Sequence, residues 1–464
     1  MAKYKSKKDK KSIIVLGLCA CLLIAFSFSV IVSYTQNQSQ FFKDRTFIDA
    51  VSEMLDKAPA DVTQEDVDSI KVLLISDESV ILGKSDLIEA IKYNENLKDG
   101  EKEKTLEDYL VEYELPKAIK YFEDIQVFKN LQYLDITGLT AFKSFDSVLG
   151  FKDLEYLTVS DLEIKSLEGV QTLSKLRVLY AEQNKLTSVE PLKDMIGLEK
   201  LSLTSNEISD LSPISGLVNL TTLGIGKNKI EDISAISGFT KMEHLAITEN
   251  EVESIIKLEN MTELKSLAID GCGISDISVV SAFTKLESLY MNKNEIADIT
   301  ALNALSKLKE LYMSENKITD VSPLAALKSL TTIDASKNEI TDISKLSELE
   351  ALTALIVNEN KINKIEGISK LKKLQYLYIN KNELTDVTEL GKLTSLYYLI
   401  IGDNPGVTDW KPLDSLTSTY VDRTDAPKTE TTVPDDSTPA TTPQSTSATT
   451  PASVPDTTTS AENE

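Results

Sequence analysis

Apolar residues recur along most of the chain with a period of 22 residues. Each unit begins with the pattern L-x-x-L-x-L-x-x-N, as in Leu198, Leu201, Leu203 and Asn206. The alternation of apolar and polar residues around Leu201 and Leu203 predicts a short strand with one face turned inward. Thirteen units follow one another, with their first apolar residues at positions 131, 154, 176, 198, 220, 242, 264, 286, 308, 330, 352, 374 and 396.

The second half of each unit carries further apolar residues, such as Ile208, Leu211, Ile214 and Leu217. The segment is too short for a regular α-helix, and it predicts 3₁₀ turns that return the chain along the opposite side. One unit cannot bury its apolar face alone, so neighbouring units must stack. The repeat therefore predicts a solenoid with a parallel sheet on one side and 3₁₀ turns on the other.

An asparagine occupies the ninth place of almost every unit, where the strand ends. Its amide both donates and accepts, so we expect it to satisfy backbone groups of its own unit and the next. Cys272 takes this place once; we interpret it as a substitution in the ladder, with a reactive thiol as the alternative. We call these positions the asparagine ladder: Asn184, Asn206, Asn228, Asn250, Cys272, Asn294, Asn316, Asn338, Asn360, Asn382 and Asn404.

These features resemble the internalin family of bacterial leucine-rich-repeat surface proteins. The resemblance rests on the 22-residue period and on the rhythm of Asn206, Ile208, Asp210 and Leu211 with the Pro-Ile or Pro-Leu that follows. It implies an α/β solenoid, a leucine-rich-repeat horseshoe with a parallel concave sheet, 3₁₀ turns on the convex side and a helical N-terminal cap. It also implies a cell-envelope protein that binds proteins of a host or neighbouring cell through its concave face.

The other segments complete the predicted domain organisation. Residues 47–124 are similar to the family's helical cap, with inserted charged helical sequence from residue 86 onward. Residues 125–424 hold the solenoid of about 13 repeats and a C-terminal cap, where Asn404-Pro405-Gly406 adds one residue to the last unit. Residues 425–464 are rich in Ser, Thr and Pro and predict a disordered tail.

The N-terminal residues predict a membrane anchor. Residues 1–12 form a basic stub, residues 13–33 are almost entirely apolar, and residues 34–46 form a linker. At ~1.5 Å per residue the apolar segment spans a bilayer, and the basic stub favours the cytoplasmic side. We therefore predict a single-pass protein with its N-terminus inside and the bulk of the chain extracellular. The alternatives are secretion after signal cleavage and a lipid anchor at Cys21.

Composition limits the function classes. The formal net charge is −24, which argues against nucleic-acid binding, and the only histidine is His244. No nucleophile–base pair, phosphate loop or metal-spaced cluster is present in the sequence, so we predict no enzyme, no cofactor and no metal. The aspartates at the thirteenth place recur with the fold, so we interpret them as structural: Asp210, Asp232, Asp276, Asp298, Asp320, Asp342 and Asp386.

The concave face is the candidate binding surface. The third and fifth places of each unit point away from the core, and in the C-terminal half they form a stripe of Tyr and Ile. Such a stripe favours a protein interface, with ordinary packing along the strands as the alternative. We predict a monomeric, adhesin-like protein-binding module; binding of an envelope carbohydrate polymer and scaffolding of envelope proteins are the other candidate functions. The predicted contact residues are Tyr290, Tyr312, Ile356, Tyr376, Tyr378, Tyr398 and Ile400.

Overall fold

A computed structural model describes residues 42–423, apart from residues 44, 96–101, 103, 107–110, 115–121, 140–141, 143 and 253. The chain divides into two compact units, residues 1–154 and residues 155–464, which are described separately. The stub 1–12, the apolar segment 13–33 and the tail 425–464 lie outside the described residues.

The first unit combines helices with short strands. Strand β1 pairs antiparallel with β2 and parallel with β4, and β2 pairs antiparallel with β3. Phe42, Phe47 and Phe128 lie with ring centroids 5.4–5.9 Å apart and form part of its core. Its elements are α3 (Arg45–Leu55), η1 (Pro59–Asp61), α4 (Gln64–Asp68), β1 (Val72–Ile75), β2 (Ser79–Gly83), α5 (Ser85–Glu95), β3 (Val111–Glu114), η3 (Phe122–Val127), β4 (Tyr133–Asp135) and η4 (Phe145–Ser147).

The predicted helical cap is confirmed, although strands β1, β2 and β3 were not expected. The apolar runs of β1 and β2 are only four and five residues long, and at that length periodicity does not separate a strand from a buried helix. Helix α5 lies at the start of the segment 86–124 in which inserted helical sequence is expected, and much of the rest of that segment lies outside the described residues. Strand β3 lies within the same charged segment, where Val111 and Tyr113 alternate with two glutamates as in a strand.

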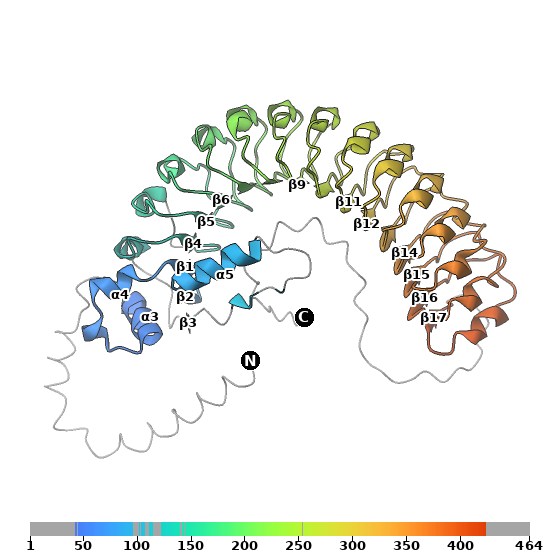
Figure 1. Ribbon diagram of the computed structural model, residues 1–464, viewed down its shortest axis with the longest axis horizontal. Coiled ribbons are helices and arrows are strands. Elements are labelled where there is room, and N and C mark those ends of the chain that lie inside the picture. Colours follow the sequence, from blue (N-terminus) through green and yellow to red (C-terminus); the bar gives the residue numbers. More distant parts are fainter. Residues whose placement is uncertain are drawn as a thin grey trace, which may run out of the picture. The chain divides into compact units, whose positions relative to one another are not determined.

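The second unit is a solenoid with a sheet of parallel strands. Each strand pairs with the next one in sequence, so Leu201 lies opposite Leu179 and Leu223. In Figure 1 the strands line the inner side of this arc and the helical turns lie on its outer side. The strands are β5 (Tyr156–Thr158), β6 (Val178–Tyr180), β7 (Lys200–Ser202), β8 (Thr222–Gly224), β9 (His244–Ala246), β10 (Ser266–Ala268), β11 (Ser288–Tyr290), β12 (Glu310–Tyr312), β13 (Thr332–Asp334), β14 (Ala354–Ile356), β15 (Tyr376–Tyr378), β16 (Tyr398–Ile400) and β17 (Tyr420–Asp422).

The outer side of the second unit is built from 3₁₀ turns, as the spacing predicts. Asp210 accepts hydrogen bonds from the backbone N–H and the Oγ of Ser212 at the start of such a turn, so the aspartate series serves the fold. The turns are η5 (Val170–Thr172), η6 (Glu190–Leu192), η7 (Ser212–Gly216), η8 (Ser234–Ile236), η9 (Ile256–Leu258), η10 (Ser278–Ala282), η11 (Thr300–Ala304), η12 (Ser322–Ala326), η13 (Ser344–Glu348), η14 (Ile368–Lys370), η15 (Leu390–Lys392) and η16 (Lys411–Ser415).

The asparagine ladder joins each 22-residue repeat to the preceding repeat by hydrogen bonds. Asn206 Nδ2 donates to the carbonyl of Ala181 at 2.9 Å, and its Oδ1 accepts from the N–H of Leu186 at 3.0 Å. Both partners belong to the preceding repeat, not to the next one as expected, whereas the expected bond within its own repeat is present, from Nδ2 to the carbonyl of Leu203 at 2.9 Å. Cys272 is buried at 5% exposure, its Sγ donates to the carbonyl of Ile247 at 3.2 Å, and burial raises the pKa of its thiol to about 11. A buried, protonated thiol in this position serves the ladder.

The predicted localisation needs correction. Within the described ranges, no helix is long and apolar enough to cross a membrane. Helices α3 and α5 have 11 residues each, so at ~1.5 Å per residue they reach only about half of a bilayer core. The anchor was assigned to residues 13–33, which lie outside the described residues. The single-pass arrangement with an extracellular chain is therefore not retained.

Candidate functional site

The sheet presents two rows of side chains on its inner face. The third and fifth residues of each unit are the first and last residues of each strand, and the apolar residue between them is buried, as Leu289 is between Ser288 and Tyr290. Side chains alternate along a strand, so all seven predicted contact residues share the inner face. The structure divides them into two groups that differ in exposure.

Tyr290 and Tyr312 form a closed pair in the middle of the sheet. Their rings stack at 4.9 Å between centroids with an interplanar angle of 4°, and each side chain is only 8% exposed. They pack in one cluster with Ala268. The hydroxyl of Tyr290 donates to Glu310 at 3.3 Å. Burial, and then the charge of Glu310, raises the pKa of Tyr290 to about 12. These two rings already have partners within the chain.

Tyr376 and Tyr398 form an open pair nearer the end of the solenoid. Their rings also stack, at 5.8 Å and 8°, but both residues are half-buried. Tyr378 lies on the same face and is half-buried as well, and burial raises its pKa. The remaining predicted residues, Ile356 and Ile400, are likewise half-buried. This half of the stripe therefore keeps apolar and aromatic surface accessible.

Two exposed tyrosines were missed by the sequence analysis. Tyr420, on β17, is 56% exposed and its ring lies 5.8 Å from that of Tyr398. It continues the third-place row by 22 residues, so extending the repeat by one unit would have found it. Tyr397 is also 56% exposed and its ring contacts Tyr376 edge-on at 6.4 Å. It occupies a second place, which the concave-face criterion does not include.

The middle of the inner face is polar and internally bonded. Asp270 Oδ1 accepts from the backbone and side-chain amides of Asn292 at 2.8 and 2.6 Å. Asn292 Oδ1 in turn accepts from the N–H and Oγ of Ser314, both at 2.8 Å. Burial raises the pKa of Asp270 and lowers the pKa of His244, so the imidazole of His244 is neutral near pH 7. Asp270, Asn292 and Ser314 therefore form a chain of hydrogen bonds across three successive repeats.

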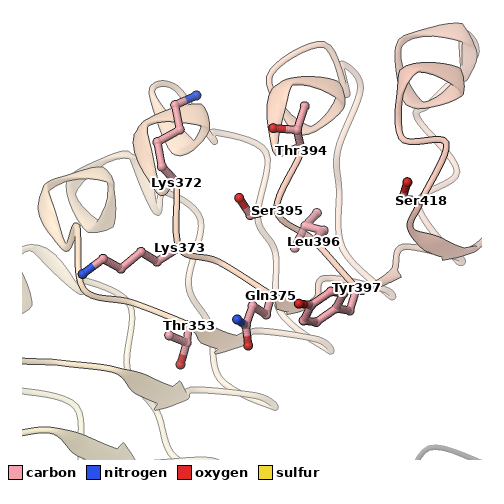
Figure 2. A pocket seen from close by; sticks show the side chains of 9 residues that line it. All are labelled: Thr353, Lys372, Lys373, Gln375, Thr394, Ser395, Leu396, Tyr397 and Ser418. Atoms are coloured by element: carbon pink, nitrogen blue, oxygen red, sulfur yellow. The ribbon is translucent and has the colours of Figure 1, made fainter.

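A hollow of about 480 Å³ lies on the flank where the last strands begin (Figure 2). Gln375 and Tyr397 border it beside the strands, and Lys372 and Lys373 border it beside the preceding segment. Its lining is otherwise mainly polar and consists of Thr353, Thr394, Ser395, Leu396 and Ser418.

Comparison with known proteins identifies the repeat. The family described as Leucine Rich repeats (2 copies) matches residues 174–216, 196–239, 284–326, 306–350 and 350–392. No relative was found among curated proteins.

Several solved structures share the architecture. An internalin of Listeria monocytogenes, InlF, is 28% identical, with a TM-score of 0.61 over 82% of this chain and 96% of that chain. A leucine-rich-repeat protein of Leptospira interrogans is 21% identical, with a TM-score of 0.52 over 64% of this chain and 91% of that one. The functional domain of InlJ from Listeria monocytogenes, described as including a cysteine ladder, is 17% identical, with a TM-score of 0.51 over 78% and 80% of the two chains.

Proposed function

Because this chain is an internalin-like leucine-rich-repeat protein, we propose that it binds a protein partner through the C-terminal half of its concave face. The contact surface comprises Ile356, Tyr376, Tyr378, Tyr398 and Ile400, extended by Tyr420 on the last strand. The observation that carries the proposal is the accessible aromatic row of Tyr376, Tyr398 and Tyr420, whose rings lie 5.8 Å apart in succession.

The size and chemistry of this row suit a protein interface. A buried aromatic side chain hides ~150–250 Å², so four tyrosines and two isoleucines supply the core of an interface of ~800 Å² per partner. Tyrosine is enriched among residues that dominate binding energy, and its stacked neighbours hold each ring in place before binding. The net charge of −24 favours a basic or neutral partner.

The finer form of the proposal is adhesin-like recognition of a protein on a host or neighbouring cell. It is supported by the likeness to the internalin of Listeria monocytogenes, which covers 82% of this chain.

The test compares proteins captured by the immobilised full chain with those captured by the variant Tyr376→Ala/Tyr398→Ala. A direct partner is lost from the variant and kept by Ile256→Ala, a control in which a 48% exposed apolar residue of η9 on the outer side is removed. Capture that is equal for all three proteins would exclude the aromatic row as the site.

Treating intact cells with protease or with glycosidases before they contact the chain separates the two ligand classes. Binding that survives protease but not glycosidases would replace the protein partner with an envelope carbohydrate.

A further inference from the structure

We propose that the hollow bordered by Lys372, Lys373 and Tyr397 is a second binding site, and that it takes an anionic saccharide. It lies on the flank of the solenoid, not on the inner face, and none of the residues that line it belongs to the proposed protein-binding surface. The ligand chemistry follows from three properties of its lining: unpaired cations, free hydrogen-bonding groups and an exposed aromatic ring.

The flank on which the hollow lies changes character along the solenoid. We call the second-place residues of the units the strand-start row. In the first part of the row, charged residues of neighbouring repeats form ion pairs. Arg177 pairs with Glu155 and Glu199, Lys265 with Glu243, and Lys309 with Glu287. From residue 331 onward the row has no charge, and it consists of Thr331, Thr353, Gln375 and Tyr397.

The two lysines of the hollow, Lys372 and Lys373, form no ion pair with another described residue. Lys285 occupies the last place of its unit and pairs with Glu263, the last residue of the unit before, at 2.5 Å. Lys373 has the same place, but Ala351 and Ser395 occupy it in the adjoining units; Lys372, one place earlier, has Glu350 at its place in the preceding unit and Thr394 in the next. In the described part of the chain neither Lys372 nor Lys373 forms an ion pair, and both are exposed. In a protein with a net charge of −24, two adjacent unpaired lysines mark a local site for an anion.

The rest of the lining offers hydrogen bonds and one ring. The side chains of Gln375, Thr394, Ser395 and Ser418 make no hydrogen bond to another described residue, so their amide and hydroxyl groups are available. Tyr397 is 56% exposed, while its edge contact with Tyr376 at 6.4 Å holds the ring in place. Figure 2 shows the ring next to Gln375, while the side chains of Lys372 and Lys373 extend away from the ring in two directions.

This combination favours a sugar acid over an acidic peptide. A pyranose ring presents C–H groups that pack on an aromatic face, several hydroxyls that pair with amides and hydroxyls, and, in a uronic acid, a carboxylate for the lysines. Acidic peptide motifs are recognised by arginine clusters, and other peptides by a strand edge or by apolar pockets for their side chains; none of the residues that line the hollow is an arginine. Of the nine lining residues only Leu396 is aliphatic, and it is buried.

The experiment titrates the full chain calorimetrically with oligogalacturonate, with its methyl ester and with poly-glutamate. We expect oligogalacturonate to bind in a salt-dependent manner, and the uncharged ester and the acidic peptide to bind at least about tenfold more weakly. Equal binding of oligogalacturonate and poly-glutamate would overturn the saccharide assignment, and absence of oligogalacturonate binding would overturn the site.

Variants locate the binding. Lys372→Gln/Lys373→Gln and Tyr397→Ala should each weaken oligogalacturonate binding about tenfold, and their exposed positions make loss of folding unexpected. Lys285→Gln, which removes a paired lysine from the same place, should bind as the unchanged protein does. Tyr398→Ala/Tyr420→Ala, which removes two rings of the aromatic row and leaves the contact between Tyr376 and Tyr397 intact, should retain more than half of the affinity, so that failure of the protein-binding surface and failure of this hollow remain distinguishable. Equal binding by all four variants would contradict the proposal.

Discussion

The closed pair, Tyr290 and Tyr312, and the open pair, Tyr376 and Tyr398, show how one local geometry serves two purposes. Both pairs stack across adjacent parallel strands with nearly parallel ring planes, and their ring centroids lie 4.9 and 5.8 Å apart. The closed pair is 8% exposed and one of its hydroxyls is bonded to Glu310, whereas the open pair is half-buried. An aromatic ladder on a sheet therefore indicates a binding surface only where its rings keep surface that is accessible to a partner.

The difference arises from the place that each pair occupies in the repeat. The closed pair lies at the fifth place, between Ala268 and Asp334 in the register of the sheet, and the hydroxyl of Tyr290 is bonded to Glu310. The open pair lies at the third place, and the row continues to Tyr420 on the last strand of the sheet. Tyr376 also has an alanine beside it, Ala354 of β14, so the size of that neighbour does not explain the difference in exposure.

The largest expected difference between the two pairs appears when the tyrosines of each pair are replaced by alanine. Tyr290→Ala/Tyr312→Ala should lower the free energy of unfolding by about 3 kcal/mol or more, because it deletes buried rings and leaves a cavity. Tyr376→Ala/Tyr398→Ala should cost about 1 kcal/mol, as expected for half-buried side chains. Urea denaturation measures both. Equal losses of stability in the two double variants would show that the pairs do not differ as described.

A smaller effect concerns the hydroxyl groups. Tyr290→Phe keeps the ring stack and removes the hydrogen bond to Glu310, so it should lower the free energy of unfolding by about 1 kcal/mol. Glu310→Gln keeps an acceptor for the same hydroxyl and should cost less. Tyr376→Phe serves as the control and should leave the urea midpoint unchanged. A larger loss for Tyr376→Phe than for Tyr290→Phe would contradict the assignment of closed and open pairs.

The fold was predictable because the same pattern of apolar residues and asparagine recurs in most repeats. Leu201 and its equivalents fix the strands, and Asn206 and its equivalents fix the turns, so one misjudged unit changes little. The strands of the first unit were not predictable in this way, since the short apolar runs at Val72–Ile75 and Ser79–Gly83 occur once each. Only tertiary pairing selects a strand there.

The face of the sheet on which the candidate residues lie was predictable from the sequence, but the exposure of their side chains was not. Position in the repeat places Tyr290 and Tyr376 on the same face, but burial depends on the neighbours across strands. Tyr290 and Tyr376 each have an alanine and a tyrosine in register on the adjacent strands, but only the hydroxyl of Tyr290 also reaches a carboxylate there, that of Glu310. The paired or unpaired state of lysines such as Lys285 and Lys373 also depends on residues one unit away, which become neighbours only after stacking.

The smallest effect is a shift in the titration of one tyrosine among sixteen. Tyr290 has a pKa of about 12 against an ordinary value of 10.0, chiefly through burial and then through the charge of Glu310. In the pH window from 10 to 12 the unfolded chain releases this proton while the folded chain keeps it, so stability is fully present below pH 10 and falls as pH rises through that window.

Subtracting the tyrosinate absorbance titration of Tyr290→Phe from that of the unchanged protein isolates this ring. The difference should have its midpoint near pH 12, and Glu310→Gln should move the midpoint toward 10 because it removes the second cause of the shift. Tyr378 is the control from the open half: burial also raises its pKa, but Glu310 is not among the causes. The difference titration from Tyr378→Phe should therefore be the same with or without Glu310→Gln. If the midpoint of Tyr290 ignores Glu310→Gln, its hydroxyl is not held by that carboxylate, and burial alone separates the closed pair from the open one.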